Sequence, residues 1–332
     1  MTRFQPQSTS PAPAPAPLPL RPPASSGVAL AYQAQAQAAA EAAAQAGRAA
    51  RVTLRELSEP AEHAGVEALF AEIWATGPGQ TPMPAGVMRM LAYTGSYVAG
   101  AFDGDRLVGG GVAFLTGSHG EAELDGGLSS RLVSLHSHIV GVAADLAGRH
   151  AGLAIKLHQR AWALQRGLGT ISWTYDPLVR RNAYFNLTKL GADATRYLVD
   201  FYGDMSDGVN VGQGSDRLFV DWDLGSQRCA AAIAGFLSVP DIEPLLRTGR
   251  VLIAADDGRS PAAAKVSGRG PLLCGLPADI ELMRKTDPAR ALQWRLAVRD
   301  ALGGAMARGF RIVGFARAGY YLLEHPEEAE YK

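Results

Sequence analysis

The sequence predicts an α/β (α+β) protein in which helices flank a central mixed, mostly antiparallel sheet. From residue 51 onward, the spacing of apolar residues alternates between two, as in strands, and about 3.6, as in helices. The expected elements follow the order strand, helix, hairpin, strand, helix, strand, helix, strand, strand. The chain has neither a G-x-G-x-x-G motif nor a phosphate loop ending in Gly-Lys-Ser/Thr, which excludes a doubly wound dinucleotide-binding fold.

Each expected element has its own local signal. Residues 52–57 alternate apolar and polar, and residues 61–75 place Val66, Phe70 and Ile73 on one helical face. Gly104 permits a tight turn in a hairpin. The hairpin strands and the later elements are expected at 96–102 and 107–115 (strands), 132–142 (strand), 152–166 (helix), 170–175 (strand), 179–190 (helix ended by Gly191), and 194–202 and 217–224 (strands).

Composition excludes several functional classes. The 332 residues include 32 Lys+Arg and 32 Asp+Glu, so the chain has no global surplus of positive charge for a nucleic acid. It lacks the run of about 18 uncharged apolar residues that a membrane span needs. Two cysteines, Cys229 and Cys274, are too few for a disulfide framework or a zinc site. A cytoplasmic protein with no metal is therefore expected.

Composition also divides the chain into three regions. Residues 1–27 hold eight of the 20 prolines, and the following stretch to residue 50 is nearly all Ala and Gln. A helix is plausible in that stretch, but it has no large apolar stripe for docking, so residues 1–50 are expected to be a disordered Pro/Ala-rich tail. An export signal is the competing interpretation, although its ordered pattern is missing. Residues 51–225 form the main domain.

Residues 226–332 are expected to form a C-terminal α/β extension packed on the first domain. Strands are expected at 250–254, 272–276 and 310–315, with a long helix at 288–308. No catalytic constellation is evident there. The region is expected to extend the sheet, to cover apolar surface or to form a homodimer.

A turn of small residues joins the expected strand that ends at Val142 to the helix that follows it. The dipole and the unpaired N–H groups of a helix N-terminus favour a phosphate group. A tight turn with no ligand is the alternative on spacing alone, since Gly148 and Gly152 are compatible both with a phosphate-binding turn and with a ligand-free turn.

The residues of this turn resemble the pyrophosphate loop of the GNAT acyltransferases, which take an acyl group from coenzyme A. Arg149-x-x-Gly152-x-Ala154 fits the family pattern, and Ala147-x-x-His150-x-Gly152 is a second register. The resemblance implies the GNAT fold and phosphate binding by the amides of Arg149, His150, Ala151, Gly152, Leu153 and Ala154. His150 replaces a glycine in the second register, and a positive φ there would carry a steric cost.

A narrower resemblance is to a branch of this superfamily related to amino-acid N-acyltransferases and N-succinyltransferases. Its most specific run is Asn182-Ala-Tyr-Phe-Asn-Leu-Thr-Lys-Leu-Gly191, with a second at Trp173-Thr-Tyr-Asp-Pro-Leu178. The resemblance extends over about residues 52–324. It implies acetyl-CoA or succinyl-CoA as co-substrate and a small amine, such as an amino acid, as acceptor.

The resemblance also implies that the strand ending at Val142 separates from the strand at 170–175, and that the pantetheine arm of the cofactor enters the gap between them. The main chain at Val140, Gly141 and Val142 is expected to pair with the pantetheine arm, with a backbone N–H near Val142 as oxyanion donor. Asn182 is expected either to bond the pantetheine amides or to cap a helix. Lys156 and Arg160, one turn apart, are expected either to meet nucleotide phosphates or to lie on a solvated face.

An attacking amine must lose a proton, which makes a base of near-neutral pKa useful. His136 and His138 are two apart on a strand, which predicts that both project from the face that carries Val140 and Val142. They are the expected acid/base candidates, although half-buried structural histidines would show the same spacing. Asp176 is the second candidate for the base.

Leu187 occupies the position at which many GNAT members carry a tyrosine that protonates the leaving thiolate. Tyr184 is one turn earlier and projects about 60° away.

The carboxylate of an amino-acid acceptor would need a cation, for which the candidates are Arg131, Arg180, Arg181 and Arg217. The predicted function is acyl transfer from acyl-CoA to a small primary amine. The alternative is a non-catalytic acyl-CoA-binding or regulatory protein.

Overall fold

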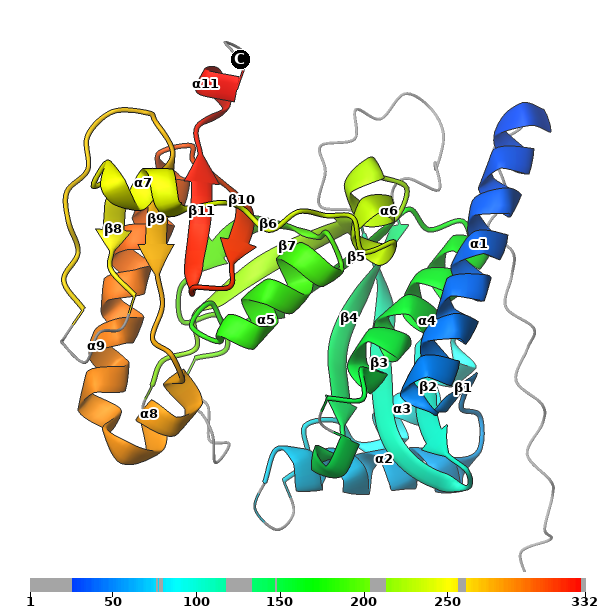
Figure 1. Ribbon diagram of the computed structural model, residues 1–332. Helices are drawn as coiled ribbons and strands as arrows, with labels where there is room; N and C mark the ends of the chain where they lie inside the picture. The colour runs from blue at the N-terminus through cyan, green and yellow to red at the C-terminus, as the bar shows by residue number, and fades with distance from the viewer. Residues whose placement is uncertain are drawn as a thin grey trace, which may run out of the picture.

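The computed structural model describes residues 26–75, 77, 80–117, 133–146, 148–203, 213–255 and 261–329. Within these residues there are two sheets, one of seven strands in the order β1-β2-β3-β4-β5-β7-β6 and one of four in the order β10-β11-β9-β8. Figure 1 shows the sheets in separate halves of the molecule. The C-terminal region therefore has its own sheet, and the prediction that it extends the first sheet is wrong.

The first sheet is mixed and mostly antiparallel, as the sequence predicted. Its β4–β5 pair is parallel, whereas its other neighbouring strands are antiparallel. The strands are β1 (Thr53–Glu56), β2 (Tyr97–Asp103), β3 (Arg106–Gly117), β4 (Val133–Val142), β5 (Thr170–Tyr175), β6 (Asp193–Leu198) and β7 (Arg217–Asp223).

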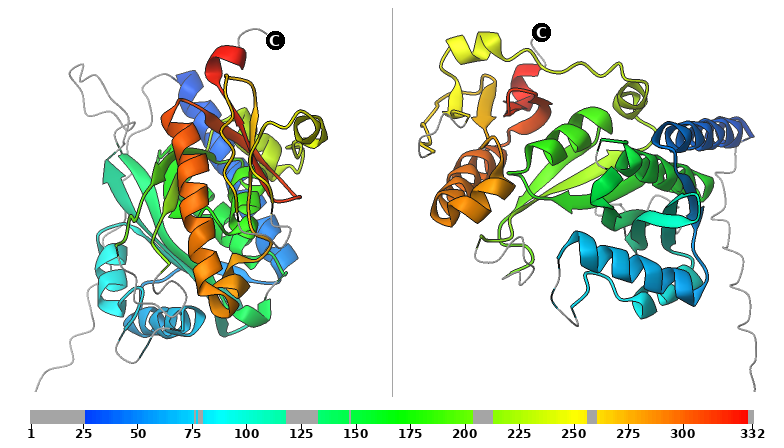
Figure 2. Two further views of the ribbon diagram at one scale, coloured as in Figure 1. Left: turned by 90° about the vertical axis from the view of Figure 1, so that its left-hand side faces the viewer. Right: turned by 60° about the horizontal axis from the view of Figure 1, so that its bottom comes forward.

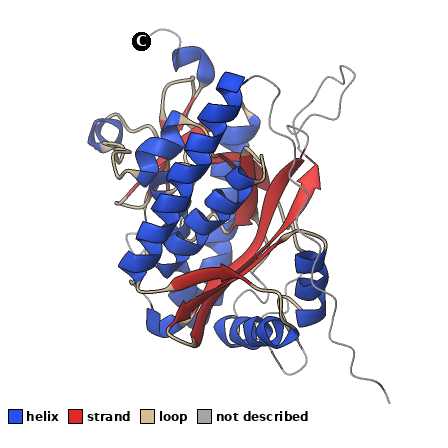
Figure 3. Ribbon diagram, turned by 90° about the vertical axis from the view of Figure 1, so that its right-hand side faces the viewer, coloured by secondary structure: helices blue, strands red, loops and turns tan. Residues whose placement is uncertain are grey.

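Helices cover both faces of this sheet. One face carries α1 (Ser26–Ala50) and α4 (Ala151–Gln165), and the other carries α2 (Pro60–Ile73) and α3 (Ala85–Tyr93) (Figures 2 and 3). The alternation of side chains along a strand builds two cores. On β2, Ala99 packs in the core on the α4 side, and its neighbour Val98 packs with the residues of α2 and α3.

Helix α1 is docked along α4, so residues 26–50 are not a disordered tail. Ala39 and Ala43 are buried and share a core with Leu157, Ala161 and Trp162 of α4. Alanine side chains bring little apolar area of their own, but their small size lets two helix backbones approach closely, and the larger residues of α4 supply the apolar area. Residues 1–25 of the expected tail lie outside the described residues.

A short helix, α5 (Arg180–Tyr184), continues into a π-helical turn, Phe185–Lys189, where a single helix was expected. The second sheet contains β8 (Val251–Ile253), β9 (Leu272–Gly275), β10 (Arg311–Ala316) and β11 (Tyr320–Glu324). The remaining helices of the described C-terminal residues are α6 (Gln227–Ile233), α7 (Glu243–Arg247), α8 (Ile280–Thr286), α9 (Pro288–Val298), α10 (Gly304–Ala307) and α11 (Pro326–Ala329), with a π-helical turn, Arg299–Gly303, between α9 and α10.

The two halves are packed against each other through buried contacts. The hydroxyl of Tyr321 on β11 donates to the carbonyl of Pro177, 2.8 Å away, just after β5. Trp294 and Val298 of α9 belong to the same buried cluster as Trp173 and Trp222 of the first sheet. No helix in the described ranges is both long enough and apolar enough to span a membrane.

Candidate active site

Strands β4 and β5 are paired over only two residues and then separate. The ladder joins Leu135 to Ile171 and His136 to Ser172, while both strands continue beyond these pairs. We call the point of separation the β4–β5 fork, bounded by Ser137 and Trp173. From Ser137 onward, the edge of β4 that faces β5 has no strand partner among the described residues. A fork at this position is the feature that the GNAT resemblance implied.

A β-bulge at His138 changes which side chains share a face of β4. Consecutive β3 residues Val112 and Ala113 pair with Ile139 and Ser137, so His138 is the extra residue. The alternation shifts by one after it. Val140 and Val142 pack with α4, whereas Ile139 packs with α2 and α3.

The bulge corrects one prediction. His136 and His138 do lie near each other, but they are not in line with Val140 and Val142, which are on the α4 side of the sheet. Without a bulge, positions 136 to 142 would alternate strictly, and all four side chains would share one face.

Both histidine rings contact Phe114 of β3, with ring centroids 5.2 Å (His136) and 5.8 Å (His138) from the centroid of the Phe114 ring. His136 is half-buried and its Nδ1 is 3.0 Å from the Ser172 hydroxyl, and its ring stacks on Phe219 at 6.1 Å. The His138 side chain retains solvent exposure, yet the surrounding protein atoms lower its pKa by desolvation. His138 is therefore largely neutral at pH 7 and reachable from solvent, as a base for an amine must be.

The turn before α4 contains the strained residue that the sequence predicted. His150, the N-cap of α4, has φ 61° and ψ 19°, which is the left-handed region. Leu153 and Ala154 donate their amides to the His150 carbonyl, so they do not face a ligand. Among the described residues, the amides of Ala151 and Gly152 have no such acceptor and are the donors best placed for a phosphate.

Replacing His150 by glycine is expected to stabilise the protein, because glycine adopts the left-handed region without the steric cost that histidine carries. The gain is up to about 1 kcal/mol after the greater chain entropy of glycine in the unfolded state is subtracted. A higher urea midpoint with an unchanged slope for His150→Gly checks this. A lower midpoint would show that the imidazole makes a contact worth more than the backbone strain.

The Arg149 side chain holds the turn in place. Its Nη1 is 2.9 Å from the Asp103 carboxylate, and its Nη2 donates to the carbonyls of Ala50 and Arg51. These contacts tie the turn to the β2–β3 hairpin and to the end of α1, so the guanidinium is already engaged away from the amides of the turn. Ala147, which begins the second register, lies outside the described residues.

Gly141 is required by α2. A Cβ on Gly141 would lie 2.9 Å from side-chain atoms of Ile73 and Trp74. Its missing side chain therefore lets α2 and the residue after it pack on the sheet. The pantetheine contacts proposed for Val140, Gly141 and Val142 concern main-chain groups, which lie along the edge of β4 beyond the fork.

Lys156 and Arg160 are both buried, so neither expectation for them holds: they lie neither on a solvated face nor at the helix N-terminus. The Arg160 guanidinium donates to the Leu224 carbonyl at 2.9 Å. The Lys156 ammonium reaches the β4–β5 fork, where its Nζ is 2.8 Å from the Ser137 hydroxyl and 3.8 Å from the centroid of the Trp173 ring. The sequence analysis missed this position because the apolar spacing of α4 does not reveal that Lys156 faces the sheet.

The structure contradicts one of the two alternatives for Asn182, the helix cap, and the pantetheine contact stays a prediction. Val179 is the N-cap of α5, so Asn182 is within the first turn and does not cap the helix. The Tyr184 hydroxyl accepts a hydrogen bond from Arg317 of the C-terminal region and is directed there. Leu187 is buried in the main core. No hydroxyl from these positions replaces the tyrosine that many GNAT members use as an acid.

Asp176 is a structural carboxylate and is unsuited to act as a base. Arg295 bonds both of its oxygens at 2.8 Å, and Arg284 also donates to it. All three side chains are buried. Although burial opposes the charge, these two guanidinium groups hold the pKa of Asp176 well below its usual range. The carboxylate links the end of β5 in the first half to α8 and α9 in the second. Local sequence does not reveal these two arginine partners, because they lie more than 100 residues away in the chain.

The arginines proposed for the acceptor are engaged elsewhere or outside the described residues. Arg180 donates to the Leu276 carbonyl, Arg181 pairs with Glu281, and Arg217 is buried and donates to the Asp216 carbonyl. Arg131 is outside the described residues.

The sequence analysis did not identify Arg196 of β6 as a cation near the candidate site. It is exposed, and its guanidinium lies 4.1 Å from the centroid of the Phe219 ring, on the same sheet face as His136. The pairing of Arg196 with Phe219 across β6 and β7 depends on a bulge, for which the sequence offered no signal.

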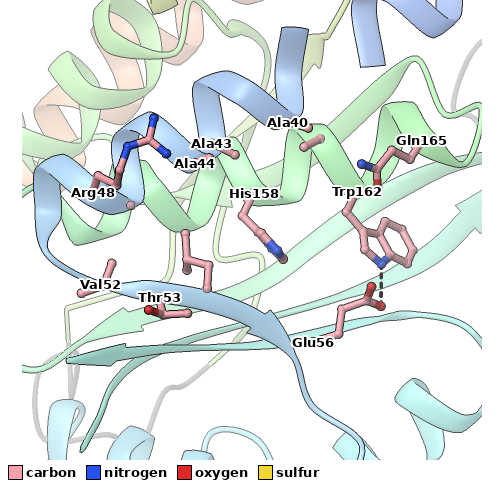
Figure 4. A pocket seen from close by; sticks show the side chains of 13 residues that line it. Ala40, Ala43, Ala44, Arg48, Val52, Thr53, Glu56, His158, Trp162 and Gln165 are labelled. Carbon is pink, nitrogen blue, oxygen red and sulfur yellow. Dashed lines mark hydrogen bonds between the residues drawn. The ribbon is translucent and has the colours of Figure 1, made fainter. Parts of the chain in front are cut away.

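A pocket of about 400 Å³ lies elsewhere, between α1, β1 and α4 (Figure 4). Alanines of α1 line one side, and His158 and Trp162 of α4 line the other. The Trp162 indole donates to Glu56 at 2.8 Å, and His158 Nδ1 is 2.8 Å from the Tyr97 hydroxyl. The small side chains of α1 account for the space. No group of three or more potential metal ligands is found in the described residues.

Comparison with known proteins finds no matching protein-family model and no matching curated sequence. Solved structures do match. One is a Desulfovibrio desulfuricans protein described as a GNAT-family acetyltransferase, with 17% identity, a TM-score of 0.35, and coverage of 52% of this chain and 99% of that one. Another is Arabidopsis thaliana NAA60 in complex with acetyl-CoA, with 14% identity, a TM-score of 0.40, and coverage of 52% and 99%.

A third match is Chaetomium thermophilum Naa20 in complex with a bisubstrate analogue, with 16% identity, a TM-score of 0.39, and coverage of 52% of this chain and 86% of that one. In the chain itself, the mixed seven-stranded sheet, the β4–β5 fork and the small-residue turn before α4 occur together. By these features, residues 53–223 form the mixed, mostly antiparallel sheet with flanking helices that the sequence predicted, and the fork and the turn lie where the GNAT resemblance implied them.

Proposed function

We propose that the protein is an N-acyltransferase that moves an acyl group from acyl-CoA to the amine of a small molecule. The observation that carries this proposal is the β4–β5 fork. It begins beside Ser137 and Trp173 and leaves the β4 edge from there to Val142 without a strand partner among the described residues. An extended pantetheine arm could pair with that edge, and its diphosphate would lie near the amides of Ala151 and Gly152.

The fork connects the two faces of the sheet, which suits a reaction between two substrates. The thioester would approach from the α4 side, and the amine from the face that carries His138. The amine nitrogen attacks the thioester carbon and loses a proton to His138, directly or through water. A backbone N–H of β4 beyond the fork would stabilise the oxyanion. The C–S bond then breaks, leaving an amide and coenzyme A.

An amino acid is the proposed class of acceptor. Arg196 supplies an exposed guanidinium on the sheet face that carries His136, and such a group can hold a carboxylate with two parallel bonds. Acetyl and succinyl groups are the proposed acyl donors. The buried, free thiols of Cys229 and Cys274 support a cytoplasmic setting.

The test is to incubate the purified full-length chain with acetyl-CoA or succinyl-CoA and a panel of amino acids, and to measure release of free thiol. Amine-dependent thiol release, with the acylated product seen by mass spectrometry, is the expected result. Measurable coenzyme A binding without release of free thiol for any amine would favour the alternative, a non-catalytic acyl-CoA binder. This alternative is suggested by Leu187, which stands where many GNAT members carry the acidic tyrosine. A chain that does not bind coenzyme A refutes both.

A further inference from the structure

Lys156 occupies the β4–β5 fork although no part of the reaction described above uses it. The residue is 5% exposed, and its Nζ contacts the first residue of each strand beyond the ladder, at 2.8 Å from the Ser137 Oγ and 3.8 Å from the Trp173 ring centroid. A lysine at this depth usually pairs with a carboxylate, because burying an isolated ammonium is costly. Among the described residues, no carboxylate forms a salt bridge with Lys156.

The surroundings of Lys156 contain a second polar group without a partner. Gln159 is fully buried, and its Oε1 accepts a hydrogen bond from Ser137 at 3.0 Å, while its Nε2 has no hydrogen-bond partner in the described structure. Buried polar groups are nearly always satisfied, so an unpaired amide next to an ammonium that lacks a counter-ion indicates a place where a polar ligand group binds.

The charged groups near Lys156 do not fix its side chain as an ammonium or as a neutral amine. The titratable and charged groups on surrounding elements are His158 and Arg160 on α4, Glu56 on β1, Tyr97 on β2, Tyr175 on β5 with Asp176 directly after it, Cys229 on α6, and His136 and His138 on the other face of β4. Asp176 is neutralised by its two arginines. Burial lowers the pKa of Lys156 to about 7, so the amine can both hold and release a proton near neutrality.

We propose, on the basis of the proposed function, that Lys156 is the acid that protonates the departing thiolate of coenzyme A. The amine attacks from the face of His138, and the sulfur leaves toward α4, where Lys156 lies. As the C–S bond breaks, its electron pair passes to sulfur, which takes a proton from the ammonium. Lysine is left as a neutral amine and regains its proton from solvent, while the attacking nitrogen gives its proton to His138. The products are the amide and the coenzyme A thiol.

This assignment accounts for the missing tyrosine. Neither residue of the helix after β5 supplies an acid at the fork, because Leu187 has no ionisable group and is buried in the core, and the Tyr184 hydroxyl is directed toward Arg317. The proton donor comes instead from α4, which supplies Lys156 to the fork. Since a thiolate is a fair leaving group without assistance, Lys156 accelerates the reaction but is not indispensable to it.

The decisive experiment compares the wild-type chain with Lys156→Met, which keeps the length of the side chain and removes its proton. Single-turnover rates with acetyl-CoA and the best amino-acid acceptor isolate the chemical step. We expect a loss of about 10²-fold in Lys156→Met, with an unchanged dissociation constant for coenzyme A by calorimetry. Lys265→Met, at an exposed lysine of the C-terminal region, is the matched control and should keep the wild-type rate.

The pH profile separates acid catalysis from a packing role. The acid form of Lys156 predominates below its pKa, so the wild-type rate should fall as pH rises through about 7, and this fall should be absent in Lys156→Met. The pH profile of the wild-type chain tests the proposal even if Lys156→Met does not fold. A wild-type rate without this fall, or a variant with the wild-type rate and profile, overturns the role of Lys156 while leaving the proposed function intact. A wild-type chain that transfers no acyl group refutes the proposed function and this proposal together.

Discussion

Replacing Asp176 with asparagine is expected to destabilise the protein by about 3–5 kcal/mol, a loss that few single substitutions reach. Asparagine keeps the shape of the side chain but removes the charge that neutralises Arg284 and Arg295. Arg295 is 1% exposed and would keep a buried positive charge without its partner. Because total stabilities are typically about 5–15 kcal/mol, the variant would approach global unfolding.

Urea denaturation of full-length Asp176→Asn measures the loss, with Asp105→Asn at the exposed hairpin turn as control. The pH dependence gives an independent check. The native pKa of Asp176 is depressed, so its contribution is present above its unfolded pKa, near 3.8, and is lost as pH falls toward the lower native value. Wild type should therefore lose more stability on acidification than Asp176→Asn. A variant that keeps its stability but loses acyl transfer would restore Asp176 as a base.

Replacing His138 with alanine is expected to lower the acyl-transfer rate by about 10²-fold or more. Its imidazole is exposed at the bulge of β4, beside the fork, and its lowered pKa keeps it neutral at pH 7. His136 is held by the Ser172 hydroxyl and stacked on Phe219, so His136→Ala should have the smaller effect.

The check for His138 is the acidic side of the pH–rate profile. The base form of His138 is lost as pH falls, so wild-type activity should drop at a pH below the ordinary histidine pKa of 6.5, and His138→Ala should lack this drop. His325→Ala, in the C-terminal region, serves as the matched control. Equal rates for His138→Ala and wild type would remove this residue from the mechanism and leave a water molecule as the proton acceptor.

Local sequence predicted most strands of the first half with small errors at their ends. The strand expected at 170–175 is β5 itself, and the expected helix at 152–166 is α4 shifted by one residue at each end. Helices α3, α6, α7, α8 and α11 and strand β11 were not predicted. The helix expected at 179–190 is interrupted by a π-helical turn because residues after α5 must meet both halves of the molecule, and tertiary packing overrides the local period.

The location of the candidate site was predicted more accurately than the directions in which its side chains point. The turn before α4, the steric cost of a positive φ at His150 and the separation of β4 from β5 were all anticipated at the positions where they occur. The direction of the side chains was not, because the bulge at His138 adds one residue to β4 and moves Val140 to the opposite face. A bulge is decided by how two strands pair, which neither strand specifies alone.

Apolar spacing was sufficient to predict the class of fold, and the residues of one turn were sufficient to place the turn before α4, because both depend on neighbours in the sequence. Contacts between distant segments decided the remaining properties. Docked α1 buries α4, the second half supplies Arg284 and Arg295 to Asp176, and the fork receives Lys156 from the helix above it. Burial and ion pairing set the protonation of these side chains, and the sequence alone contains neither.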